Sequence, residues 1–141
     1  MAVISKKIYL AQSVFYSFID RVHSRHNHAQ AFFRYFAQEE FVLFTDTNTI
    51  NQTYNQIYKE ISPSLARDFL KTIFLSNINI IYPDQSDIKA ALKTLVNYQS
   101  PELTFSDAIM AVLANRRGVS QIATFDYLHP LFGLSAFFLP I

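Results

Sequence analysis

Short apolar runs alternate along the chain with longer segments whose apolar residues recur at helical spacing. Such runs are typical of strands buried on both faces, and the longer segments are typical of helices with one apolar face. The predicted strands span residues 8–11, 41–44, 78–82 and 121–124, with 137–139 as a candidate fifth, and the predicted helices span 14–19, 29–40, 47–61, 63–73, 83–95 and 104–117. Strands separated by helices predict an α/β fold with a central, mostly parallel sheet flanked by helices.

Composition narrows the class of protein. The 141 residues include 14 Phe and 8 Tyr, which is enough apolar surface to exclude a disordered chain. Two glycines exclude a Gly-rich phosphate loop, and the absence of Cys excludes disulfides, thiolate metal sites and thiol nucleophiles. We therefore expect a single domain over residues 1–141, located in a reducing compartment such as the cytoplasm.

Charge and hydropathy limit the classes of partner that the chain can have. A formal net charge of +1 argues against a strongly electrostatic nucleic-acid binder and implies no DNA specificity. The apolar segment 8–19 follows two lysines, as in a signal peptide, but it contains Gln12, Ser13 and Ser17. It is also shorter than the about 20 apolar residues that span a bilayer. We expect no membrane partner.

Candidate chemistry lies just after the predicted strands, because ligands of parallel sheets bind outside the carboxyl ends of the strands. Asp126 follows the fourth strand, and Asp107 lies in the first turn of a helix that starts with a Thr104-x-x-Asp107 pattern and ends at Gly118. Two carboxylates at one rim would suit Mg²⁺ or Mn²⁺, which prefer oxygen ligands. The structural alternative is that Asp107 stabilises the helix dipole and Asp126 caps a turn.

Short motifs at these positions recur in one known family. The specific pair is residues 103–108 (LTFSDA) and 123–126 (ATFD), which are separated by a helix; weaker matches are 8–15, 20–29 with its Asn27-His28, and 45–53. With these motifs the chain resembles the PIN-domain family, metal-dependent ribonucleases that include the VapC-type toxins, over nearly its whole length. The resemblance implies a PIN-like three-layer fold with a sheet of four to five strands.

The resemblance also assigns the acidic positions of the family. The first falls on Ala11, the second on Gln52, and the third and fourth on Asp107 and Asp126. Family members use the four carboxylates to hold Mg²⁺ or Mn²⁺, and this chain keeps two of them, so the metal should bind weakly or not at all. We therefore expect an impaired or lost nuclease site in a protein that acts through RNA or protein binding. The alternatives are an active VapC-like endoribonuclease that uses Asp107 and Asp126, and a non-catalytic subunit that pairs with another PIN protein.

A second register is possible at residues 44–50 (FTDTNTI), which also resemble the opening motif of the family. That register makes Asp46 the first metal ligand, but it leaves too short a chain before Asp107 and excludes the first forty residues. We prefer the whole-chain register. Whether Asp46 reaches the site from a different position, and so replaces a missing ligand, stays open.

Polar and basic residues near the rim are candidates for substrate contacts. Ser106 could support Asp107 through a hydrogen bond or simply cap its helix. The histidines His23, His26 and His28 are expected to pack or to be solvated rather than to bind metal. For His129 we expect an ordinary surface or core role rather than that of an acid or base near a phosphate. The candidate contacts to RNA are Ser13, Thr45, Asn48, Arg21 and Arg25.

Aromatic residues are in excess on the second predicted helix, where Phe32, Phe33, Tyr35 and Phe36 point in different directions. Excess apolar surface marks either an interface or a large core. PIN relatives form homodimers, and toxin members bind an antitoxin peptide. The resemblance therefore implies a homodimer and an antitoxin-like peptide as partners.

Overall fold

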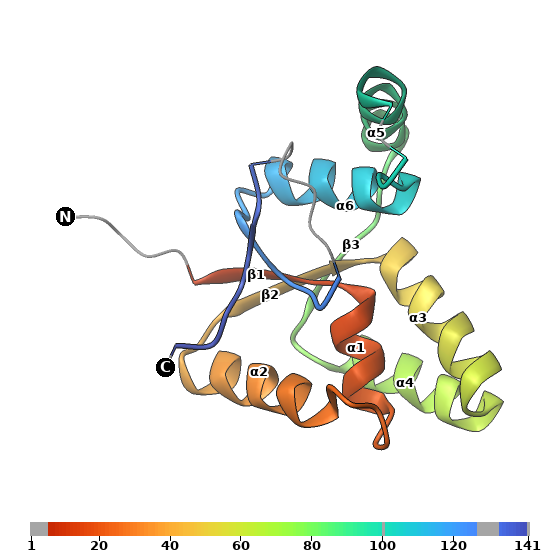
Figure 1. Ribbon diagram of the computed structural model, residues 1–141, viewed down its shortest axis with the longest axis vertical. Helices are drawn as coiled ribbons and strands as arrows, with labels where there is room; N and C mark the ends of the chain where they lie inside the picture. Colours follow the sequence, from red (N-terminus) through yellow and green to blue (C-terminus); the bar gives the residue numbers. More distant parts are fainter. Residues whose placement is uncertain (1–5, 100, 127–132, 141) are drawn as a thin grey trace.

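The computed structural model describes residues 6–99, 101–126 and 133–140, and its strands form one parallel sheet (Figure 1). The order across the sheet is β3-β2-β1-β4-β5, and every neighbouring pair is parallel. The strands are β1 (Lys7–Leu10), β2 (Val42–Asp46), β3 (Asn79–Ile81), β4 (Gln121–Ala123) and β5 (Ser135–Ala136). The predicted α/β fold with a parallel central sheet is confirmed.

Helices cover both faces of the sheet and make a three-layer molecule. They are α1 (Gln12–Ile19), α2 (His26–Gln38), α3 (Thr47–Glu60), α4 (Pro63–Leu75), α5 (Gln85–Tyr98) and α6 (Phe105–Arg116). The first four lie on one side of the sheet, and α5 and α6 lie on the other (Figure 1). Within the described ranges, no helix has the length and apolar character needed to cross a membrane.

One element differs from its prediction. The fifth strand is Ser135–Ala136 rather than residues 137–139. The apolar run identified residues that pack, because Phe137 is buried, whereas the pairing falls just before it. The backbone N–H of Phe137 still donates to the Ile122 carbonyl at 2.8 Å, which extends the contact with β4 by one bond.

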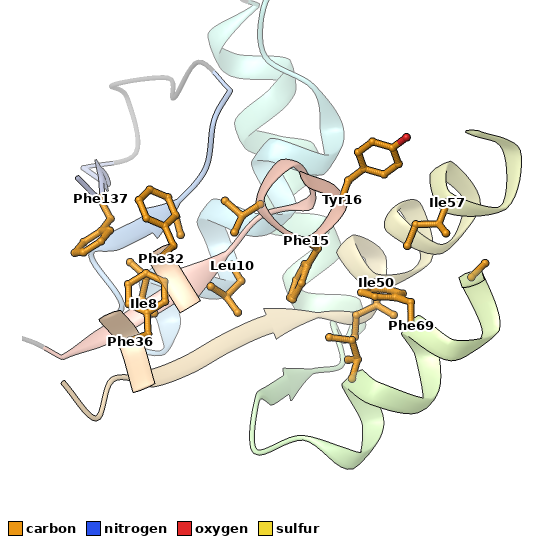
Figure 2. Packing of buried hydrophobic residues seen from close by; sticks show 14 residues of the cluster. Ile8, Leu10, Phe15, Tyr16, Phe32, Phe36, Ile50, Ile57, Phe69 and Phe137 are labelled. Carbon is orange, nitrogen blue, oxygen red and sulfur yellow. The ribbon is translucent and has the colours of Figure 1, made fainter. Parts of the chain in front are cut away.

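The aromatic residues of α2 are part of the core. Phe32 and Phe36 are buried and contact Phe137, with ring centroids 5.5 and 5.0 Å apart (Figure 2). Tyr35 packs on the outer side of the same cluster, 5.6 Å from Phe137 and 5.8 Å from Phe41. These contacts explain most of the aromatic excess that the sequence shows on this helix. The most exposed of the large apolar side chains among the described residues lie elsewhere: Val22, Phe74, Leu75, Tyr82, Leu92, Val96, Tyr98 and Phe138.

A buried carboxylate joins α5 to α6. Asp87 accepts the backbone N–H of Asp84 at 2.9 Å and forms an ion pair with Arg116 at the end of α6. The Asp84 N–H, followed by the Arg116 guanidinium, holds the pKa of Asp87 below its ordinary value, although burial acts in the opposite direction. The ionised form is therefore favoured in the folded state, and its stabilising effect is lost as the pH falls through the lowered pKa.

Replacing Asp87 with Asn is expected to lower the free energy of unfolding at pH 7 by about 1–2 kcal/mol, the worth of hydrogen bonds to a charged group. The difference from the parent chain should shrink as the pH falls below the ordinary Asp range, where Asp87 itself becomes protonated. Urea unfolding at pH 7 and at a pH below the ordinary Asp range measures the effect. Asp68→Asn, at an exposed position of α4, is the matched control, and an equal loss in both variants would contradict the role of Asp87.

Candidate functional site

A pocket of about 640 Å³ lies at the carboxyl edge of the sheet. Its lining combines the residues after β1 and β4 with one side of α3 and the first turns of α6. The lining residues of this main pocket are Ala11, Gln12, Thr49, Gln52, Glu102, Thr104, Ser106, Asp107, Met110, Ala111, Ile122, Thr124, Asp126 and Leu134. The pocket thus contains Ala11, Gln52, Asp107 and Asp126, the four positions at which the sequence predicts the acidic set.

The turn after β4 is held by hydroxyl groups. Ser13 at the start of α1 accepts the backbone N–H of Phe125 at 2.9 Å, and its hydroxyl lies 3.2 Å from that of Thr124. The Thr124 hydroxyl in turn accepts the backbone N–H of Asp126 at 3.1 Å. These bonds hold the exposed Asp126 at the rim of the pocket, so Ser13 acts on the site through the backbone of this turn.

Asp107 is fixed by the start of α6. Its backbone N–H donates to the Thr104 hydroxyl at 3.1 Å, and its carboxylate accepts the Thr104 backbone N–H at 3.5 Å. This is the capping box that the Thr104-x-x-Asp107 pattern predicts. The carboxylate is half-buried and lines the main pocket, so its helix-capping role and its place in the pocket coexist.

Neutral groups occupy the other two positions. Ala11 is the N-cap residue of α1 and offers no side-chain acceptor to the pocket. The Gln52 amide donates to the Ser106 hydroxyl oxygen at 2.6 Å, and the Asn48 amide donates to the same oxygen at 3.3 Å. The amides and the Ser106 hydroxyl are neutral, so these groups supply hydrogen bonds but no negative charge.

Glu102 is a lining residue that the sequence pattern did not single out. It brings a third carboxylate to the main pocket from the turn before α6, five positions ahead of Asp107. Its closeness to the predicted acidic motif is the signal that could have identified it. Even so, the described residues include no group of three or more His, Cys, Asp or Glu side chains that could hold a metal ion.

The donor chemistry of the pocket fits one hard cation. Mg²⁺ is commonly held by one or two carboxylates together with water and substrate phosphate oxygens. Asp107 and Asp126 are the residues that would hold it, with carboxylate oxygens of the kind that Mg²⁺ or Mn²⁺ takes. A pair of ions would need more carboxylates than these.

Asp46 lies outside the main pocket, in the interior of the protein. It is 1% exposed, accepts the backbone N–H and the hydroxyl of Thr49 at 2.7 and 3.0 Å, and also accepts a hydrogen bond from the Tyr9 phenol. Burial, and then the neighbouring Asp46 carboxylate, raises the pKa of Tyr9 far above its ordinary value, so the phenol keeps its proton and donates it. The carboxylate of Asp46 thus caps α3 and anchors it to β1.

A smaller pocket of about 310 Å³ adjoins the main pocket, and we call it the side pocket. It shares Gln12 and Asp126 with the main pocket, and its other lining residues are Ser13, Tyr16, Ser17, His23, Arg25, Gln56 and Phe125. Of the predicted RNA contacts, Ser13 and Arg25 line this pocket, whereas the exposed Arg21 and the half-buried Asn48 line neither pocket. Thr45 is fully buried and donates its hydroxyl to the Leu10 carbonyl at 3.1 Å, so its contacts are internal.

The histidines of residues 23–28 make separate local contacts. The His26 ring nitrogen lies 3.0 Å from the Ser17 carbonyl, and the His28 ring packs against Phe32 and Phe125. His23 lines the side pocket. They therefore pack or face the pocket individually, and the prediction for His129 lies outside the described residues.

Comparison with known proteins agrees with this geometry. A family model of the PIN domain matches residues 8–129, and no curated protein matches the chain. The fold is similar to that of Mycobacterium tuberculosis VapC20, a sarcin-ricin loop cleaving toxin, with a TM-score of 0.76 and 18% identity over 84% of this chain and 89% of that one. It is also similar to VapBC2 from Rickettsia felis bound to a DNA fragment from its promoter, with a TM-score of 0.66 and 13% identity over 92% and 96% of the two chains. A third neighbour is FitAcB from Neisseria gonorrhoeae, with a TM-score of 0.60 and 12% identity over 92% and 96%.

The family model extends over every residue that lines the main pocket except Leu134. The chain belongs to the PIN domain family.

Proposed function

We propose that this protein binds single-stranded RNA across the main pocket and that its capacity for metal-dependent phosphodiester hydrolysis is impaired. The observation that carries the proposal is the pair of neutral residues at the pocket, Ala11 without an acceptor and Gln52 donating to Ser106. Where two carboxylates of the family would repel a phosphate, this pocket has the Ala11 methyl group and the Gln52 amide, while negative charge remains elsewhere in its lining. The PIN domain and the VapC-like fold support RNA as the ligand class.

Some side chains of the main pocket offer hydrogen bonds, and others offer negative charge. Gln52 and Ser106 form a polar wall that can meet phosphate or ribose oxygens, and Asn48 donates to Ser106 from outside the lining. Asp107 and Asp126 are the residues that would hold Mg²⁺ or Mn²⁺, which when bound supplies positive charge to the phosphate. With two carboxylates in place of four, we expect that ion to bind weakly.

A second candidate function is a residual, one-ion endoribonuclease activity. The observation that favours it is Glu102, which adds a third carboxylate to the lining of the main pocket. Glu102 does not form a metal-holding group of three with Asp107 and Asp126, but its negative charge in the same pocket would raise the local concentration of divalent cations.

The partner predictions extend the same proposal. An antitoxin-like peptide is supported by the likeness of the fold to VapC20, a toxin, and to VapBC2 and FitAcB. A homodimer, or pairing with another PIN protein as a non-catalytic subunit, would cover apolar side chains that are exposed in this chain, such as Leu92 and Val96 on α5.

RNA cleavage with Mn²⁺ or Mg²⁺ tests the proposal, with an EDTA control and an Asp107→Ala variant beside it. We expect the parent chain to bind a labelled oligoribonucleotide and to cleave it no faster than Asp107→Ala. Asp68→Ala, on the exposed side of α4, controls for loss of a carboxylate. Metal-dependent cleavage that disappears only in Asp107→Ala would overturn the impaired site in favour of the second candidate, and failure to bind RNA would overturn both.

A further inference from the structure

The side pocket differs from the main pocket in charge, although the two are continuous. Gln12 and Asp126 line both of them, so they form the boundary between the two cavities. Beyond this boundary the side pocket carries Arg25 and His23, whereas the main pocket carries Glu102 and Asp107. A ligand that extends from one pocket into the other therefore passes from a lining with three carboxylates, Glu102, Asp107 and Asp126, to one that contains a guanidinium group.

Arg25 is held at the side pocket by an aromatic ring. Its guanidinium carbon lies 5.1 Å from the centre of the Phe125 ring, and that ring is stacked on Phe32 at 5.3 Å. Stacking on a fixed ring restricts the side chain while its N–H groups stay available at the edge of the guanidinium plane. Across the part of the chain that the structure describes, no carboxylate forms an ion pair with Arg25.

His23 is oriented by a backbone bond. Its Nδ1 atom accepts the N–H of Arg25 at 3.0 Å, and its ring meets the edge of Tyr16 at 5.9 Å. Because Nδ1 acts as the acceptor, the neutral ring carries its hydrogen on Nε2, which makes His23 a donor. The amide pair of Gln12 and Gln56, 2.8 Å apart, adds a neutral polar wall to the same pocket.

We infer that the side pocket is a phosphate subsite for single-stranded RNA, in which Arg25 and His23 bind a phosphodiester while the adjoining nucleotide lies in the main pocket. The inference rests on the proposed function, because it assigns a second contact to the same RNA strand. Arg25 supplies charge and a planar set of donors, and His23 supplies one further donor. Asp126 at the boundary and the carboxylates of the main pocket disfavour a phosphate there, so the phosphate is directed to Arg25.

The salt dependence of binding tests this subsite. The probe is a short fluorescein-labelled oligouridine, titrated in EDTA at several KCl concentrations. Removing one cationic group that neutralises a phosphate of a single strand lowers the slope of log affinity against log salt by about 0.7. We expect Arg25→Ala to show this drop together with weaker binding, and Arg67→Ala, which removes an exposed Arg from α4, to leave both quantities unchanged.

Two further variants separate the contributions of the neighbouring groups. His23→Ala should weaken binding about three- to tenfold, the effect of removing one hydrogen bond, without changing the salt slope at a pH where the ring is neutral. Asp126→Asn should tighten binding about fivefold in EDTA, because a negative charge at the boundary is removed. Oligouridine binding by the parent chain with Arg25→Ala equal to Arg67→Ala would overturn the subsite alone, whereas no binding by the parent chain would overturn the proposed function.

Discussion

Replacing Ala11 with Asp and Gln52 with Glu in one chain is expected to tighten Mn²⁺ binding by about a hundredfold. The attraction between a dication and one carboxylate 4 Å away is about 2 kcal/mol even in a medium as polarisable as water, or more than tenfold in affinity for each added group. RNA cleavage that depends on the metal should appear together with this gain. Isothermal titration with Mn²⁺ and a cleavage assay measure the two effects.

The fold should accept both substitutions. Ala11 has the extended backbone of an N-cap residue and makes no side-chain cap, and Asp is one of the preferred residues at such a position. Glu at position 52 can accept a hydrogen bond from Ser106, because a hydroxyl that now receives the Gln52 amide can donate instead. Gln30→Glu with Ala37→Asp, at exposed positions of α2, adds the same charge away from the pocket. Equal Mn²⁺ affinity in the two double variants would show that Ala11 and Gln52 are not the acidic positions.

Replacing Asp46 with Ala is expected to lower the free energy of unfolding by about 3–5 kcal/mol, the cost of breaking a buried and charged hydrogen-bond network. The substitution removes the cap of α3, and it also leaves the buried Tyr9 phenol without its acceptor. Asp84→Ala is the matched control, because Asp84 caps α5 from an exposed position and its loss should cost only about 1 kcal/mol.

Chemical denaturation of both variants measures the difference between the two caps. A Tyr9→Phe/Asp46→Asn double variant keeps similar shapes and removes both charge and phenol, so it should be more stable than Asp46→Ala. Equal losses in Asp46→Ala and Asp84→Ala would contradict an anchoring role for Asp46 and return it to the set of candidate metal ligands.

The sequence predicts that the candidate residues lie together, because a parallel sheet brings the carboxyl ends of its strands to one edge. Ala11 after β1 and Asp126 after β4 line the same pocket for this reason, and β1 and β4 are neighbours in the sheet. The capping box at Thr104 and Asp107 is a local pattern, and it is present as predicted. Local geometry of this kind is readable from spacing alone.

The fates of Thr45 and Asp46 depend on contacts across the sheet, which spacing does not show. Both follow an apolar run in the sequence, as site residues do, but their partners are the Leu10 carbonyl and the Tyr9 phenol on the neighbouring strand β1. The bond between Gln52 and Ser106 likewise joins α3 to α6. Long-range pairs of this kind decide which polar residues form hydrogen bonds inside the fold and which face a pocket.

The position of β1 in the middle of the sheet also determines the order in which the protein can assemble on the ribosome. Tyr9 pairs with Phe44 on one side and with Ile122 on the other, so the second edge of β1 stays uncovered until β4 has been synthesised. The aromatic cluster of α2 is completed later still, when Phe137 has been synthesised. Until then an open strand edge and an exposed aromatic surface coexist, so we expect the nascent chain to need protection from aggregation until Phe137 has emerged.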